Sequence, residues 1–183
     1  MAVRRLVTGQ TPDGRSAFVS DEYLEPVTVA MTPGTEFYGI WGSDTPVTLP
    51  HEGSVPVLRQ WFPPTSGFRF VIVTLPPADA PAPQPVDPET AATEMEQKLP
   101  GLLETLEPNS PGMHTTDTVD VVLVVSGEVT LELDDGAEAH LRAGDTVVQN
   151  GTRHAWRNTS AEPCVLAGAQ IGAVRLARDT DTV

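Results

Sequence analysis

Two histidines and one aspartate in the second half of the chain are the residues best suited to do chemistry. His114 precedes an apolar run, Asp120 stands at the head of that run, and His154 follows a glycine-containing turn, QNGTRHAW. Two imidazoles and one carboxylate can hold a divalent metal ion and leave coordination positions open for a substrate. The same three groups can also act without a metal as an acid–base set. Both interpretations stay open at the level of sequence.

The spacing of these residues predicts that they share one face of a strand. Side chains alternate along a strand, so the even separations of His114, Thr116 and Asp120 place them on the same side. In a small barrel that side is the interior, where a small organic molecule can bind. The residues expected to contact this molecule are Thr116, Val122, Val124, Gln149 and Trp156.

The segments around these residues have the pattern of many short strands. From residue 113 onward, apolar and polar residues alternate in runs separated by turn residues, and DDG (134–136) predicts a hairpin. The runs are VDVVLVVSG, EVTLEL, AEAHLR, TVVQN and CVLAGAQIG. Short strands at this close spacing favour a sandwich or a barrel over a parallel α/β sheet.

The first half of the chain is expected to support this barrel. Residues 1–76 contain further strand-like runs, which we expect to extend the barrel sheets, cover their edges or form a dimer contact. Residues 77–107 predict a proline-rich connector and then a short helix that Asp87 caps and Pro100 ends. Residues 174–183 are expected to form a C-terminal tail.

Composition excludes several classes of function. The chain has 183 residues and a formal net charge of −14, from 25 acidic and 11 basic residues. Nucleic acids and anionic membranes bind basic patches, so neither is expected as a partner. No segment approaches 18 consecutive apolar residues, and we expect a cytoplasmic protein without a membrane span. The single cysteine, Cys164, is expected to be a buried structural thiol, and His51 and His140 are expected to face solvent.

The segment 108–173 resembles a cupin. In the first cupin motif, His114 takes the first histidine position, Asp120 takes the glutamate position and Gly127 the closing glycine. The second motif is similar at Gly144, Gly151, His154 and Asn158, with Gln149 where a proline usually stands. The chain departs from the family pattern at two ligand positions, because Thr116 replaces the second histidine and the carboxylate is an aspartate.

The resemblance implies an all-β cupin fold, a double-stranded β-helix (jelly-roll) barrel with extra N-terminal strands and a short helix. It implies an enzyme of the oxygenase or lyase/isomerase type, in which His114, His154 and Asp120 hold a divalent Fe, Zn, Mn or Ni ion. Two alternatives stay open: a metal-free dehydratase, isomerase or cyclase that uses the same histidines, and a non-catalytic small-molecule binder or sensor. A homodimer is expected.

Overall fold

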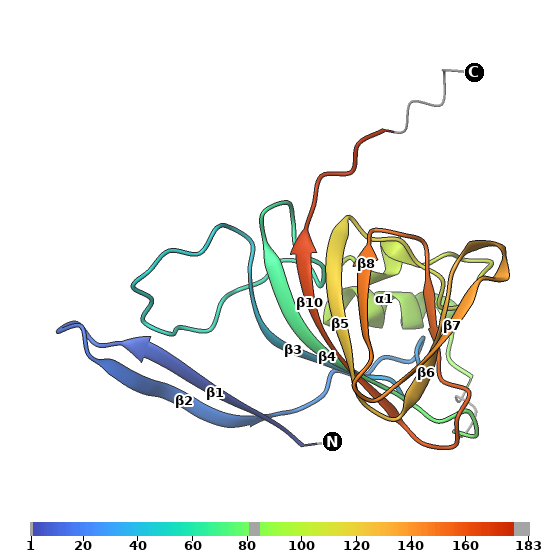
Figure 1. Cartoon of the computed structure of the whole chain (residues 1–183), viewed down its shortest axis with the longest axis horizontal. Coiled ribbons are helices and arrows are strands. Elements are labelled where there is room, and N and C mark those ends of the chain that lie inside the picture. The colour runs from blue at the N-terminus through green and yellow to red at the C-terminus, as the bar shows by residue number, and fades with distance from the viewer. Residues whose placement is uncertain (1, 81–84, 178–183) are drawn as a thin grey trace.

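The chain folds mainly into antiparallel strands, as the sequence predicted (Figure 1). The computed structural model describes residues 2–80 and 85–177. Three sheets are present in this part of the chain. The first pairs β1 (Val3–Gln10) with β2 (Ser16–Leu24). The second has the order β3 (Glu36–Ser43), β4 (Phe68–Leu75), β10 (Cys164–Gly172), β5 (Thr118–Ser126) and β8 (Thr146–Asn150). The third has the order β7 (Glu138–Arg142), β6 (Glu128–Glu132) and β9 (Ala155–Arg157).

The five-stranded sheet presents one face to the barrel interior. On β5 the even-numbered residues face inward, and Asp120 and Val124 are buried whereas Val121 and Leu123 are exposed. This alternation follows from the two-residue period of a strand. The predicted inward direction of Asp120 and Val122 is therefore confirmed.

The hairpin between β6 and β7 is also confirmed. Asp135 and Gly136 have φ angles of 57° and 70°, and a short 3₁₀ turn at Asp134–Gly136 joins the two strands. On β6, Val129 is 1% exposed and Leu131 is 6% exposed. These two side chains face inward and help to close the barrel core.

Two helices, α1 (Pro88–Lys98) and α2 (Leu102–Thr105), cover one end of the barrel. The Asp87 carboxylate accepts a hydrogen bond from the Thr90 amide at 2.9 Å, which is the predicted N-cap. Met95 and Leu99 are fully buried and pack with Phe37 of β3 in one apolar cluster. Residues 81–84 of the proline-rich connector and 178–183 of the tail lie outside the described residues.

The N-terminal strands divide between two structures. β3 and β4 extend the barrel sheet, but β1 and β2 pair only with each other, which corrects the expectation that all strands of residues 1–76 extend the barrel sheets. The β1–β2 hairpin projects from the barrel (Figure 1). It is held by the loop 44–60 and by β3, because the Gln10 amide donates to the His51 carbonyl and the Arg5 guanidinium lies 6.0 Å from the Trp41 ring centre. We call this hairpin the arm.

No helix in the described part of the chain is long and apolar enough to cross a membrane.

Candidate functional site

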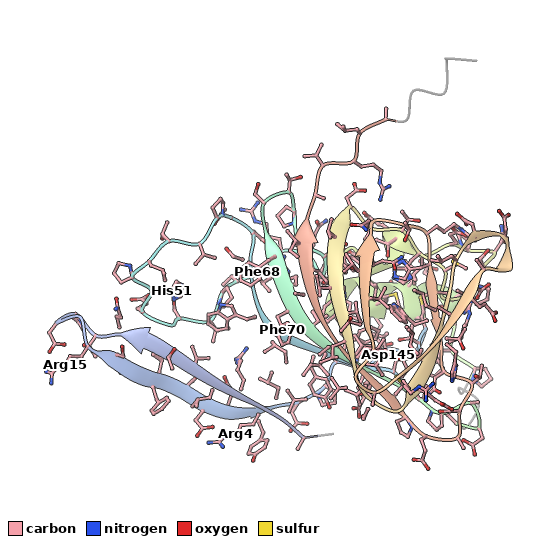
Figure 2. The ribbon with its side chains drawn as sticks, viewed as in Figure 1. Arg4, Arg15, His51, Phe68, Phe70 and Asp145 are labelled. Carbon is pink, nitrogen blue, oxygen red and sulfur yellow. The ribbon has the colours of Figure 1, made fainter. Side chains whose placement is uncertain are left out.

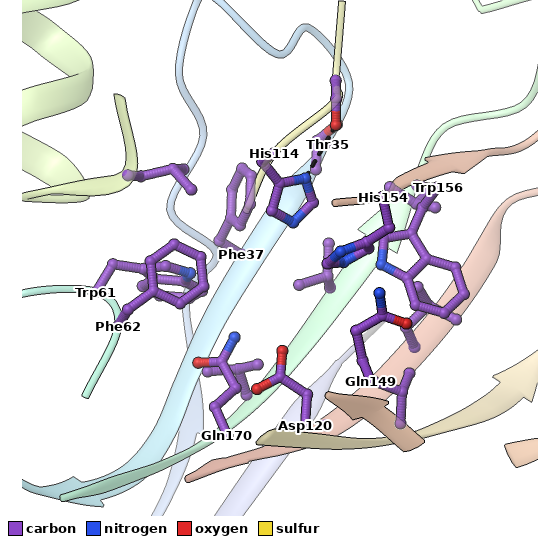
Figure 3. A pocket seen from close by; sticks show the side chains of 18 of the residues that line it. Thr35, Phe37, Trp61, Phe62, His114, Asp120, Gln149, His154, Trp156 and Gln170 are labelled. Carbon is purple, nitrogen blue, oxygen red and sulfur yellow. Dashed lines mark hydrogen bonds between the residues drawn. The ribbon is translucent and has the colours of Figure 1, made fainter. Parts of the chain in front are cut away.

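A cavity of about 260 Å³ lies inside the barrel, and the predicted triad lines it (Figure 3). The five-stranded sheet forms its floor, and His114, His154 and Trp156 form the opposite wall. Most of the other lining residues are apolar. The residues that line the cavity include no lysine and no arginine.

Three polar side chains form a row across the floor. Asp120 on β5 pairs in register with Gln170 on β10 and with Gln149 on β8. Cross-strand partners point to the same face of a sheet, so all three side chains face the cavity. The Asp120 Oδ1 and Gln170 Oε1 atoms are buried and have no hydrogen-bond partner. Buried polar atoms are nearly always satisfied, so two neighbouring unsatisfied acceptors indicate where a ligand binds.

The two histidines lie side by side on the opposite wall. Their backbones form a single antiparallel bridge, in which the His114 amide donates to the His154 carbonyl at 2.9 Å and the reverse bond measures 3.0 Å. Their ring centres are 4.2 Å apart. The bridge explains why two residues 40 positions apart in sequence meet. Figure 3 shows both imidazoles and the Asp120 carboxyl pointing into the same space.

Hydrogen bonds fix the tautomer of both imidazoles. The Nδ1 atom of His114 lies 3.0 Å from the Gly112 carbonyl oxygen, and that of His154 lies 2.9 Å from the Thr152 carbonyl oxygen. A carbonyl only accepts, so each Nδ1 carries the hydrogen. Each Nε2 therefore keeps a lone pair that can accept a hydrogen bond or bind a metal ion.

Burial shifts the pKa of all three groups toward the neutral form. It raises the pKa of the Asp120 carboxyl to about 6, although a hydrogen bond from Thr118 opposes this shift. Burial lowers the pKa of His154 to about 4, with a further contribution from the neighbouring His114. It also lowers the pKa of His114. Both imidazoles are thus neutral at neutral pH, and Asp120 is the group whose pKa lies nearest to it.

Aromatic side chains enclose the space between the polar row and the histidines. Trp156 meets the ring of His154 edge-on, with centres 6.0 Å apart. Trp61 and Phe37 form a second edge-on pair at 5.6 Å, and Phe62 lies beside them (Figure 3). These flat rings exclude water from the polar groups and offer surfaces on which a planar molecule can stack.

The structure separates the five predicted contact residues. Val122, Gln149 and Trp156 line the cavity, as predicted. Thr116 does not, because the chain between His114 and β5 is not a regular strand, and its hydroxyl bonds the Thr118 hydroxyl at 2.8 Å beside a different cavity. Val124 has the predicted inward direction but lies in the core below the cavity floor, among Val129, Cys164 and Leu166.

Several cavity residues were not identified from the sequence. Phe37, Trp61, Phe62, Leu102 and Leu106 come from the N-terminal strands, a loop and α2, and no local pattern relates them to the histidines. Gln170 did carry a signal, because it is a lone polar residue within the apolar strand CVLAGAQIG.

The fit of a metal ion to this site is incomplete. Two Nε2 lone pairs are available, and imidazole is a common ligand for divalent transition metals. In residues 2–80 and 85–177, however, no group of three or more His, Cys, Asp or Glu side chains lies close enough together to hold one ion. The ligand set of His114, His154 and Asp120 therefore stays a prediction.

The remaining candidates have structural environments. His51 and His140 are exposed, as predicted. Cys164 is fully buried in the core, and burial raises the pKa of its thiol to about 11. A thiol with this pKa is a poor nucleophile, which agrees with the predicted structural role.

Comparison with known proteins places this site in a family. Residues 102–168 match the family model of the cupin domain. Protein J of the oryzines biosynthesis cluster from Aspergillus oryzae is 36% identical over 34% of this chain and 42% of its own length. Protein C' of the phomopsin biosynthesis cluster from Diaporthe leptostromiformis is 48% identical over 26% of this chain and 25% of its own length. Each match thus spans less than half of the relative.

A solved structure with the same kind of fold is the cupin domain of Cnp3 from Schizosaccharomyces pombe. It is 9% identical and aligns over 92% of this chain and 87% of its own, with a TM-score of 0.45. The antiparallel barrel and its internal pocket define a β-barrel protein of the jelly-roll class. The family match identifies it further: the chain belongs to the cupin superfamily.

Proposed function

We propose that this chain is an enzyme that moves a proton on a small, uncharged organic molecule held inside the barrel. The observation that carries the proposal is the unpartnered carboxyl of Asp120, buried in an apolar cavity opposite two imidazoles with free Nε2 atoms. A buried acid without a partner destabilises the fold, so its presence in a cavity marks a functional group.

The lining of the cavity supports an uncharged substrate. An anionic group buried there meets no lysine or arginine, and it faces the Asp120 carboxyl. Burying such a charge without a partner is costly. The volume of about 260 Å³ lies just below the range of about 300–1,000 Å³ that is usual for ligand pockets, which favours a molecule of one or two rings.

The three polar groups divide the chemistry between them. Asp120, with a pKa of about 6, can take a proton from a carbon beside a carbonyl group and return it to another atom of the same molecule. The Nε2 atoms of the histidines accept hydrogen bonds from substrate hydroxyls and orient them. The Gln170 amide is placed to hold the carbonyl oxygen. Such an isomerisation conserves all atoms and needs no cofactor, and loss of a hydroxyl as water would give a dehydration.

The relatives are consistent with this role. Two of them are named as proteins of biosynthesis clusters. Because the matches cover less than half of those proteins, the names support small-molecule biosynthesis only as part of the proposal.

Proton exchange tests the proposal directly. We expect the protein to exchange the α-hydrogens of neutral ring ketones such as cyclohexanone and 2-hydroxycyclohexanone in D₂O, followed by proton NMR. Asp120→Asn should slow this exchange about 100-fold or more, since proton transfer by a positioned side chain contributes roughly 10²–10⁴-fold. Binding is measured by quenching of the fluorescence of Trp61 and Trp156, which line the cavity.

Two results would count against this function. Cyclohexanecarboxylate binding more tightly than the ketones would show that the cavity selects anions. An unchanged exchange rate in Asp120→Asn would remove Asp120 from the chemistry. Quenching by the ketones without any exchange would favour the non-catalytic binding role.

A metal-assisted enzyme is a second candidate, favoured by the two Nε2 lone pairs on one cavity wall. His114 and His154 would hold the ion, and a bound divalent ion supplies Lewis-acid polarisation of a carbonyl or carboxylate. The test is the metal content of the purified protein and of His114→Ala and His154→Ala. Stoichiometric metal that both variants lose supports this candidate, whereas no metal under any loading condition rejects it.

A further inference from the structure

The outer face of the five-stranded sheet is apolar. The strand registers give three cross-strand rows on this face of β4, β10, β5 and β8. The rows are Phe68–Ile171–Val119–Asn150, Phe70–Ala169–Val121–Val148 and Ile72–Ala167–Leu123–Thr146. Ten of these twelve residues are apolar and none is charged, and the two polar ones lie on the edge strand β8. We call this surface the sheet face.

The side chains of the sheet face are open to solvent in the single chain. Val148 is 60% exposed, Val121 is 47% exposed and Phe70 is 38% exposed. Figure 2 labels Phe68 and Phe70 on β4. Strands that are apolar on both faces are normally covered on both faces, and contiguous apolar surfaces of this kind mark interaction sites.

The arm carries a second exposed apolar surface. Its cross-strand pairs Arg4–Tyr23, Leu6–Asp21 and Thr8–Phe18 share one face, which we call the arm face. Phe18 is 76% exposed, Tyr23 is 67% exposed and Leu6 is 48% exposed. The other face of the arm, with Val3 and Val7 buried, packs toward the loop that carries His51. In Figure 2, Arg4 lies on the side of the arm away from that loop.

We propose that two copies of this chain form a two-fold dimer by exchanging arms, so that the arm face of each covers the sheet face of the other. One chain carries both surfaces, and a two-fold axis then covers all four at once. A two-stranded hairpin alone is marginally stable in water, which explains why the arm needs a surface to pack on.

Size and charge agree with a second copy as the occupant. A strand of eight residues, such as β1, is about 26 Å long, enough to cross four strands spaced about 4.8 Å apart. The exposed apolar side chains of the two surfaces together offer an area of the same order as the roughly 800 Å² that a standard interface takes from each partner. The charge of −14 opposes association of two copies, and an uncharged interface avoids close like-charge contacts.

The mass of the protein in solution tests the dimer. We expect about twice the 19.5 kDa of one chain for the wild type by light scattering at micromolar concentration. Val148→Asp on the sheet face and Phe18→Asp on the arm face should each raise the dimer dissociation constant at least 100-fold. Val86→Asp is the matched control, because Val86 is 46% exposed beside the N-terminus of α1, on the inner side of the sheet, and this variant should stay dimeric.

Mixing the two variants distinguishes arm exchange from other dimers. A heterodimer of Val148→Asp with Phe18→Asp keeps one wild-type arm on one wild-type sheet, so the mixture should recover dimer that neither variant forms alone. All variants are checked by circular dichroism, and Tyr23→Asp replaces Phe18→Asp if that variant unfolds. A monomeric wild type, or a Phe18→Asp protein that remains fully dimeric, overturns the proposal.

Discussion

Asp120 and His154 oppose each other in their effect on stability. The pKa of Asp120 is about 6 in the folded protein against 3.8 for an unperturbed carboxyl, so the folded state binds this proton more tightly. Stability therefore falls as the pH rises from about 4 to about 6. The pKa of His154 is about 4 against 6.5, so the unfolded state binds that proton, and stability falls as the pH drops from about 6.5 to about 4.

The first prediction is that Asp120→Asn stabilises the protein above pH 6. The substitution removes a buried charge, and a shift of about two pKa units corresponds to roughly 2–3 kcal/mol. We expect this gain in the free energy of unfolding at pH 8 and little difference from the wild type at pH 4, measured by urea unfolding.

His154→Gln is the matched control for this pH dependence. Relative to the wild type, this variant should become more stable as the pH falls from 6.5 to 4, the opposite sign to Asp120→Asn. If the difference between Asp120→Asn and the wild type is the same at pH 4 and pH 8, Asp120 has an ordinary pKa and the site needs another acid.

The second prediction concerns Gln170, whose Oε1 atom is buried without a partner. Gln170→Leu removes an unsatisfied acceptor whose burial costs about 1–3 kcal/mol, so we expect equal or higher stability in thermal unfolding. Ketone binding, measured by tryptophan quenching, should weaken several-fold if the amide holds the carbonyl oxygen. Lower stability with unchanged binding would show that Gln170 has a structural role only.

The sequence predicted the polar groups of the site better than its walls. His114, Asp120 and His154 were found because ordered motifs spaced them, and the structure brings all three to one cavity. Thr116 was misplaced because two-residue alternation holds only inside a regular strand, and β5 begins at Thr118. Trp61 and Phe62 were missed because their contacts with the histidines are set by tertiary packing, which leaves no local period.

At the scale of the elements, the third prediction uses two glycines with nearly equal backbone angles. Gly127, between β5 and β6, has φ of 74°, and Gly136, between β6 and β7, has φ of 70°. A Cβ added at Gly127 would lie 2.5 Å from the Pro163 carbonyl oxygen, whereas nothing lies within 4 Å at Gly136. Both alanine variants suffer the left-handed penalty of about 1–2 kcal/mol.

Only Gly127→Ala should also force the β5–β6 turn away from Pro163. We therefore expect Gly136→Ala to lose about 1 kcal/mol of unfolding free energy and Gly127→Ala to lose clearly more, as measured by urea unfolding. The difference between the two variants isolates the steric term. Equal losses would mean that the backbone near Pro163 moves aside without cost.

Elements with strong local signals were predicted well. The helix α1 was found from its cap and its prolines, and the strands β5 to β10 from alternation and turn residues. The run VTVAM at 27–31 was expected to be a strand and forms a single bridge, between Val27 and Phe37. The separate pairing of β1 and β2 was not foreseen, because β-branched residues show that a segment is extended but do not show which strand it pairs with.

At the scale of the whole molecule, the protein combines a strongly acidic surface with two uncharged apolar faces. The same separation appears inside, where the catalytic groups face an apolar cavity free of cationic side chains. The apolar run VVLVV of β5 joins the two, because Val122 lines the cavity while Val121 and Leu123 belong to the sheet face. A strand of this composition serves both the site and the proposed interface.

The fourth prediction follows from this charge distribution. Two chains of charge −14 repel each other, and the proposed interface contains apolar contacts and few ion pairs. Salt shortens the Debye length from about 10 Å at 0.1 M to about 3 Å at 1 M, so it screens the repulsion and leaves the apolar contacts intact. The dimer dissociation constant, measured by analytical ultracentrifugation, should therefore fall as NaCl increases from 0.05 to about 1 M. Dissociation at high salt would instead indicate an interface held by ion pairs, which the sheet face does not contain.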